Sequence, residues 1–235
     1  MERTPANSEK KRAQQILNIL RDEIPIREED FAASRVAKES ADPFRVLVVT
    51  ILSQNCTDVA ALRAYGNLDE KVGVSVPTLA HAQVRTIEKT IRVAGLHQQK
   101  AKALKQLANM VAKRYSGDFM LALEGPFEEA RAGLQELPNV GPKTADVLLS
   151  IWGRPTISVD THVDRVSKRL GLAPDKGKYE EVRSALMGLF PETDCRSIPL
   201  YFMALGRKTC KARRPLCPLC PVNDLCPYDK KTKSV

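Results

Sequence analysis

The chain has 235 residues, which is enough for one large domain or two small ones with an ordinary hydrophobic core. Hydrophobic residues make up 43% of it and charged residues 28%, so we expect a globular rather than a disordered protein. No apolar run reaches the ~18 to 20 residues of a membrane span. The polar first twelve residues contain no apolar segment of the signal-peptide type. An intracellular protein with no membrane partner is therefore predicted.

The positive charge of the chain is unevenly distributed. The formal net charge is +9, and residues 197–235 contain eight Lys or Arg but only two Asp. A basic excess confined to one region predicts a polyanionic partner, with nucleic acid ahead of an anionic membrane. The alternative at this point is a tail that only aids solubility.

Apolar residues at helical spacing predict helices along the chain. The clearest groups are Ala13, Ile16, Leu17, Leu20 and Ile24; Leu104, Leu107, Ala108 and Val111; and Val182, Leu186 and Leu189. Residues 44–52 are rich in β-branched side chains, which favours a strand. Asp42-Pro43 in front of them has the form of an N-cap followed by a first-turn proline, and we therefore predict a buried helix. The alternation typical of strands is scarce, so the predicted class is all-α.

Residues 137–145, Leu-Pro-Asn-Val-Gly-Pro-Lys-Thr-Ala, lie between two helical patterns. The first pattern runs from about residue 127 to 137, and the second contains Leu148 and Leu149 and stops at Gly153. Pro142 suits the first position of a helix, and Gly141 permits a close backbone approach or unusual dihedral angles. The free N–H groups and the dipole of the second helix favour an anion such as a DNA phosphate. A helix–hairpin–helix motif is predicted, with an ordinary tight turn as the alternative.

Two residues near this hairpin carry candidate chemistry. Lys143 falls in the first turn of the second helix, where desolvation and the helix dipole both disfavour the ammonium form. A neutral amine can form a Schiff base with a sugar carbon, whereas a charged one would simply bind phosphate. Asp160 precedes a helical pattern of Val163, Val166 and Leu170, so it is a candidate N-cap. One of its carboxylate oxygens could cap that helix while the other faces the same pocket as Lys143.

Four of the six cysteines form a compact C-x6-C-x2-C-x5-C run: Cys210, Cys217, Cys220 and Cys226. Two thiolates at C-x2-C can bind one metal centre from a tight turn. A disulfide would be expected in a secreted protein, and zinc sites more often pair two separated C-x2-C knuckles. The compact run favours an iron–sulfur cluster. Cys56 and Cys195 stand apart and are interpreted as packed thiols.

Together these motifs resemble the endonuclease III branch of the helix–hairpin–helix DNA glycosylases. The residues that carry the resemblance are the hairpin at 137–145, Val-Asp-Thr-His-Val-x-Arg-Val at 159–166, and the cysteine run at 210–226. The resemblance implies two helical domains flanking a DNA-binding cleft. A six-helix domain would span 36–154, and residues 1–35 with 155–235 would form a second domain that holds a [4Fe–4S] cluster on the four cysteines.

The resemblance also implies a chemistry for the two candidate residues. The enzyme would act, as a monomer in the cytoplasm or nucleoid, on double-stranded DNA with damaged pyrimidines or abasic sites. An oxidised pyrimidine of the thymine-glycol type would be flipped out of the duplex. Lys143 would attack C1′, displace the base and form a Schiff base that permits β-elimination. Asp160 would accept a proton or stabilise positive charge on the sugar.

Further DNA contacts follow from the same resemblance. The loop at 51–58 resembles the family loop that fills the gap left by the flipped base, and either Gln54 or Asn55 could be the filling amide. The loop at 95–101 resembles a second wedge led by Leu96, which could instead be a core leucine. The remaining expected contacts are Val140, Gly141, Thr144, His162, Lys211, Arg213 and Arg214.

Two other functions share part of this pattern. Mismatch-specific glycosylases of the same superfamily also have the cysteine run, but they differ at the position of Lys143. A non-catalytic helix–hairpin–helix module would use Lys143 only to bind phosphate and Asp160 only as a cap. The presence of Lys143 favours the enzyme with both glycosylase and lyase activity.

Overall fold

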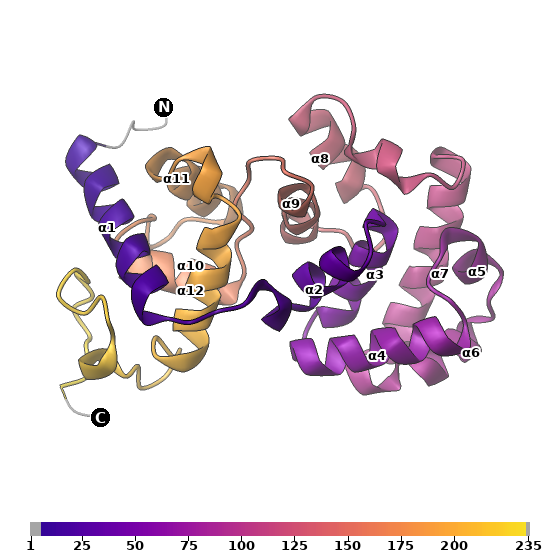
Figure 1. Ribbon diagram of the computed structural model, residues 1–235, viewed down its shortest axis with the longest axis horizontal. Coiled ribbons are helices and arrows are strands. Elements are labelled where there is room, and N and C mark those ends of the chain that lie inside the picture. The colour runs from indigo at the N-terminus through magenta and orange to yellow at the C-terminus, as the bar shows by residue number, and fades with distance from the viewer. Residues whose placement is uncertain (1–5, 234–235) are drawn as a thin grey trace. The chain divides into compact units, whose positions relative to one another are not determined.

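The computed structural model describes residues 6–233, and all regular elements among them are helices (Figure 1). The chain divides into two compact units. We call residues Arg27–Arg154 the middle unit, and the residues up to Ile26 together with those from Pro155 onward the split unit. The expected boundary between residues 154 and 155 coincides with this division, whereas the first boundary falls at residue 26 rather than 35. It falls earlier because helix α2 (Ala32–Glu39) packs against α3 (Pro43–Ser53) in the middle unit.

The middle unit contains eight α-helices where the resemblance implies six. Besides α2 and α3 they are α4 (Asp58–Lys71), α5 (Val76–His81), α6 (Val84–Thr90), α7 (His97–Arg114), α8 (Phe127–Gln135) and α9 (Pro142–Ile151). Three 3₁₀ turns, η1 (Glu28–Asp30), η2 (Arg92–Ala94) and η3 (Phe119–Leu123), complete it. The short helices α5 and α6 offer too few turns for a clear apolar period in the sequence.

Helix α3 runs through the core of the middle unit. The Asp42 carboxylate accepts a hydrogen bond from the Phe44 N–H at 2.8 Å, and Pro43 occupies the first helical position. Nine of its eleven residues are buried, and it packs against α2, α4, α7 and α9. The N-cap therefore prevailed over the strand preference of the β-branched residues, and the predicted buried helix is confirmed.

The split unit joins the first helix of the chain to its last third. Helix α1 (Asn7–Glu23) packs against α11 (Tyr179–Leu189) and α12 (Ser197–Lys208), and α10 (Thr161–Arg169) packs against both of these. The Arg12 guanidinium donates to the Leu170 and Leu225 carbonyls at 2.8 Å each. The turns η4 (Glu192–Asp194) and η5 (Cys217–Leu219) complete the unit. No helix among residues 6–233 is both long and apolar enough to cross a bilayer.

Candidate functional site

Helices α8 and α9 of the middle unit form the predicted hairpin. Asn139 takes the left-handed conformation at its tip, with φ of 60°. Gly141 has φ of −92° and ψ of −179°, which is extended backbone that any residue adopts. Apart from Gly141 itself and its neighbours in the chain, no heavy atom lies within 4 Å of the place where a Cβ on Gly141 would stand. Neither its dihedral angles nor packing within the chain therefore requires glycine at this position. The remaining reason for a glycine is the expected close approach of a ligand to the backbone.

The N-terminus of α9 leaves several amide groups available. The N–H groups of Gly141, Lys143 and Thr144 have no acceptor within the described part of the chain, and Pro142 has no N–H. The first turn carries no acidic residue. Unpaired amides and the positive end of the helix dipole together make a site for a phosphate group.

A buried ion pair fixes the two hairpin helices to each other. The Arg131 guanidinium on α8 donates to both carboxylate oxygens of Asp146 on α9, at 2.8 and 2.9 Å. The two side chains are only 9% and 0% exposed. Such a bidentate pair sets the geometry of the hairpin, and removing one partner would leave a buried charge uncompensated.

The predicted site residues of the hairpin differ in exposure. Lys143 is exposed, at the second position of α9. Val140 and Thr144 are each only 5% exposed. Any contact that these two residues make with DNA must therefore come mainly from their backbone atoms.

The loop after α3 separates the roles of its two neighbouring amides. The Gln54 side chain donates from Nε2 to the Asn139 carbonyl at 2.9 Å and to the Thr144 hydroxyl at 3.3 Å. Gln54 therefore ties this loop to the hairpin. Asn55 is exposed and adopts the left-handed conformation, with φ of 56°. Asn55 is accordingly the amide side chain that is free to project from the protein surface.

Leu96 lies just before α7 and is 49% exposed. Its backbone is left-handed, with φ of 46° and ψ of 29°, which is uncommon for a bulky residue. The alternative interpretation as a core leucine is thus wrong. An exposed apolar side chain on a strained backbone is typical of functional positions.

In the split unit, Asp160 caps α10 with a single oxygen. Its Oδ1 accepts hydrogen bonds from the N–H groups of His162 at 2.9 Å and Val163 at 2.7 Å. Its Oδ2 forms no hydrogen bond to the residues that the structure describes. The cap is therefore confirmed, and it leaves the second oxygen available for chemistry.

His162 lies in the first turn of α10. Its Nδ1 is 3.0 Å from an Nη2 of Arg165. Burial is the main cause that lowers the pKa of His162, and the nearby Arg165 and Arg207 lower it further against the attraction of Asp160. The neutral imidazole is therefore favoured next to the capping carboxylate.

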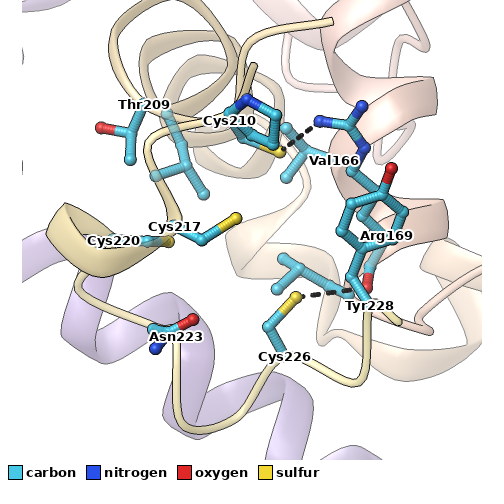
Figure 2. A pocket seen from close by; sticks show the side chains of 12 residues that line it. Val166, Arg169, Thr209, Cys210, Cys217, Cys220, Asn223, Cys226 and Tyr228 are labelled. Atoms are coloured by element: carbon cyan, nitrogen blue, oxygen red, sulfur yellow. Dashed lines mark hydrogen bonds between the residues drawn. The ribbon is translucent and has the colours of Figure 1, made fainter. Parts of the chain in front are cut away.

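The four cysteines of the compact run line one pocket in the split unit (Figure 2). The other residues that line it come from α10, α12 and the C-terminal loop. Within residues 6–233, no three His, Cys, Asp or Glu side chains are placed to hold a single metal ion. Four cysteine sulfurs that line one shared space suit an iron–sulfur cluster. Burial raises the pKa of the Cys220 thiol to about 11, so a positively charged iron centre would be needed to keep it as a thiolate.

Arg169 on α10 links this pocket to the basic loop, by which we mean residues 211–214. Its guanidinium donates to the Lys211 carbonyl at 2.7 Å and to the Ala212 carbonyl at 3.0 Å. It also donates to the Cys210 sulfur at 3.4 Å (Figure 2). The predicted contacts Lys211, Arg213 and Arg214 are exposed on this loop. Sequence reasoning missed Arg169, although its position three residues after the 159–166 motif was a possible signal.

None of the six cysteines forms a disulfide bond in the structure. Cys195 is 2% exposed, and burial is the main cause that raises its pKa to about 11. Cys56 is half-buried and its thiol contacts the Leu52 carbonyl at 3.0 Å. Both cysteines lie outside the residues that line the pocket, as expected for packed thiols.

Comparison with known proteins agrees with these features. Residues 48–192 match the family described as HhH-GPD superfamily base excision DNA repair protein. Residues 210–226 match the iron–sulfur binding domain of endonuclease III. The chain belongs to the endonuclease III family. It is therefore a base-excision repair glycosylase with abasic-site lyase activity, and it carries an iron–sulfur binding domain on the four cysteines.

Two relatives and one solved structure illustrate this similarity. Endonuclease III of Sulfolobus acidocaldarius is 36% identical over 218 residues, which cover 92% of this chain and 96% of that protein. Endonuclease III of Bacillus subtilis is 35% identical over 192 residues, covering 81% and 84%. The protein in a solved structure of a trapped endonuclease III–DNA covalent intermediate is 32% identical to this chain. The match has a TM-score of 0.72 and covers 91% of this chain and 95% of that chain. The all-α glycosylase fold is thereby confirmed.

Proposed function

We propose that this endonuclease III removes oxidised pyrimidines of the thymine-glycol type from double-stranded DNA and cleaves the resulting abasic site, with Lys143 as nucleophile. The observation that carries the proposal is the exposed Lys143 at the open N-terminus of α9, beside amides that suit a phosphate. The covalent DNA intermediate trapped for a related endonuclease III supports a reaction that passes through a bond between protein and DNA.

The proposed reaction has two stages, base release and strand cleavage. The Lys143 amine attacks C1′ of the flipped nucleotide, and the base leaves with the bonding electrons and takes up a proton. The nitrogen then gives up a proton, and the ring oxygen leaves C1′ with the bonding electrons and takes up a proton, which gives the Schiff base. Loss of a proton from C2′ expels the 3′ phosphate with the electrons of the C3′–O bond. The Oδ2 of Asp160, which the cap does not use, would accept a proton or stabilise the positive charge that develops on the sugar.

We propose that Asn55 fills the gap left by the flipped base and that Leu96 enters the opposite strand. The Gln54 side chain is engaged with the hairpin, whereas the Asn55 side chain is exposed. Gly141, with the backbone of Val140 and Thr144, would bind a phosphate, and His162 would lie near the DNA from its place beside Asp160. The enzyme would act as a monomer on DNA with damaged pyrimidines or abasic sites.

Cys210, Cys217, Cys220 and Cys226 would hold the cluster, which we propose to be of the [4Fe–4S] type. When bound, the cluster supplies a structural cross-link of the C-terminal loop. The chain's own contribution is to place Lys211, Arg213 and Arg214 on a loop that the Arg169 guanidinium holds at two carbonyls. These cations would bind DNA phosphates.

Borohydride trapping tests the assignment of Lys143. The wild-type chain should form a covalent adduct with DNA containing an abasic site, because borohydride reduces a Schiff base to a stable amine. Lys143→Gln should form none and should lose both base release and strand cleavage, while DNA binding survives through the hairpin amides and the basic loop. Lys113→Gln, at an exposed lysine of α7, is the matched control and should behave as wild type. A normal adduct with Lys143→Gln would refute the assignment.

The same preparation distinguishes the mismatch-specific alternative. A mismatch glycosylase would release the base from a G·T or G·U duplex but would leave thymine glycol in place. We expect the opposite preference here, because Lys143 is present.

A further inference from the structure

Lys100 is a buried cation in the first turn of α7. Its side chain is among the largest fully buried ones described, at 2% exposure. The ammonium Nζ donates to the Leu52 carbonyl at 2.7 Å and to the Ala94 carbonyl at 2.9 Å. Burial lowers the pKa of Lys100. A buried charge of this kind is costly and is retained only where its hydrogen bonds compensate for it.

The two carbonyls belong to the ends of two different elements. Leu52 lies in the last turn of α3, and Ala94 is the last residue of η2. Carbonyl groups at a helix C-terminus lack intrahelical partners and carry the negative end of the helix dipole. One ammonium group therefore caps two helical ends, and among the described ion pairs no carboxylate shares it.

The segments that follow these two ends are the two loops proposed to enter DNA. Asn55 comes three residues after Leu52, and Leu96 comes two residues after Ala94. Both have left-handed backbones and exposed side chains. The backbone between each held carbonyl and its DNA-facing side chain is short, so a shift of either carbonyl moves the side chain directly.

We propose that Lys100 is a positioning residue that joins the gap-filling loop and the wedge loop, so that Asn55 and Leu96 insert into DNA as one rigid pair. The proposal rests on the proposed function of these loops. Insertion on both strands at once requires that the two side chains keep a fixed separation. Misplacement by about 1 Å can reduce a rate on the order of 100-fold.

Lys105 provides a matched control on the same helix. Its Nζ also donates to two carbonyls, those of Ala80 at 3.1 Å and Ala82 at 2.7 Å. Ala80 lies in the last turn of α5 and Ala82 is the C-cap of that helix, and α6 begins beyond them, so Lys105 does not hold either DNA-facing loop. Lys100→Met and Lys105→Met remove equal numbers of hydrogen bonds, and only the first should disturb DNA insertion.

The test is a double-mutant cycle in the full-length cluster-loaded chain. Single-turnover base-excision rates on thymine-glycol duplex are measured for Asn55→Ala, Leu96→Ala and the pair, each with Lys100 intact, with Lys100→Met and with Lys105→Met. With Lys100 intact, the rate loss of the pair should differ from the product of the two single losses. The difference should lie between about twofold and a hundredfold. Lys105→Met should keep this coupling. Lys100→Met should abolish it, so that the losses multiply, and should itself slow excision about 10- to 100-fold.

A second readout reports loop insertion directly. A 2-aminopurine base beside the lesion should brighten on binding wild type or Lys105→Met, because the stack opens, and much less on binding Lys100→Met. If Lys100→Met does not fold, Lys100→Gln takes its place, since it keeps one donor. Multiplicative losses in the wild-type background, or equal behaviour of the two lysine variants, would overturn the inference. A wild-type chain without base excision would instead overturn the proposed function.

Discussion

The two carboxylate oxygens of Asp160 have different tasks, since Oδ1 accepts both cap hydrogen bonds of α10. Asn is about as good an N-cap as Asp, so Asp160→Asn should melt within a few degrees of wild type. Turnover should fall about 10²- to 10⁴-fold, because the amide cannot accept a proton. Thermal unfolding and single-turnover rates measured side by side check this. Asp160→Ala, which also loses the cap, should cost about 1 kcal/mol of stability in addition. An Asn variant with normal turnover would show that Asp160 is only a cap.

The neighbouring amides of the loop after α3 should respond differently to truncation. Asn55→Gly should slow base excision while it leaves thermal stability nearly unchanged, because the side chain is exposed and glycine also adopts the left-handed backbone. Gln54→Ala should lower stability by about 1 kcal/mol and weaken binding to undamaged DNA as well, since it releases the hairpin at Asn139 and Thr144. Denaturant unfolding and binding isotherms on both DNAs distinguish the two. If Gln54→Ala alone impairs excision, the proposed assignment of the gap-filling residue is reversed.

At the scale of elements, the open N-terminus of α9 should tolerate a methyl group in the free protein but not in the complex. Gly141→Ala should raise stability by about 0.4 to 1 kcal/mol, because Ala fits the extended backbone and restricts the unfolded chain. It should weaken DNA binding, damaged or not, since the added Cβ occupies open space where a phosphate would approach. Gly66→Ala in α4, where space is also open, should stabilise without affecting DNA affinity. Unchanged affinity in Gly141→Ala would place the phosphate elsewhere.

Elements defined by local signals were predictable from sequence, and contacts between distant segments were not. The Asp42-Pro43 cap overcame a run of β-branched residues in α3, and the Asp160 cap could be read from its place before a helical pattern. Lys100 could not be anticipated, because lysine is rarely buried and one of its partners lies 48 residues away. The link from Gln54 to the hairpin spans 85 residues and depends on tertiary packing in the same way.

At the scale of the whole molecule, the cysteine pocket predicts the metal content. Purified protein should be yellow-brown and contain about four iron atoms per chain, with little zinc. Cys217→Ser should lose iron and also weaken DNA binding, because the basic loop is no longer cross-linked. Cys56→Ser, outside the pocket, should keep its iron. Elemental analysis and visible absorbance decide the matter, and a colourless wild-type protein with one tightly held zinc would overturn the cluster.

The membership of α1 in the split unit sets an order of events on the ribosome. Its buried residues Ala13, Ile16, Leu17 and Leu20 share a core with residues from Ile157 onward, and α1 packs against α11 and α12. The nascent chain must therefore carry an uncovered apolar helix while the whole middle unit is being translated. Helix α1 is thus synthesised before the middle unit but reaches its packed position only after that unit has been made. A stalled or prematurely terminated chain that lacks α11 and α12 would keep this apolar stripe exposed, which makes it a ready target for chaperones and proteases.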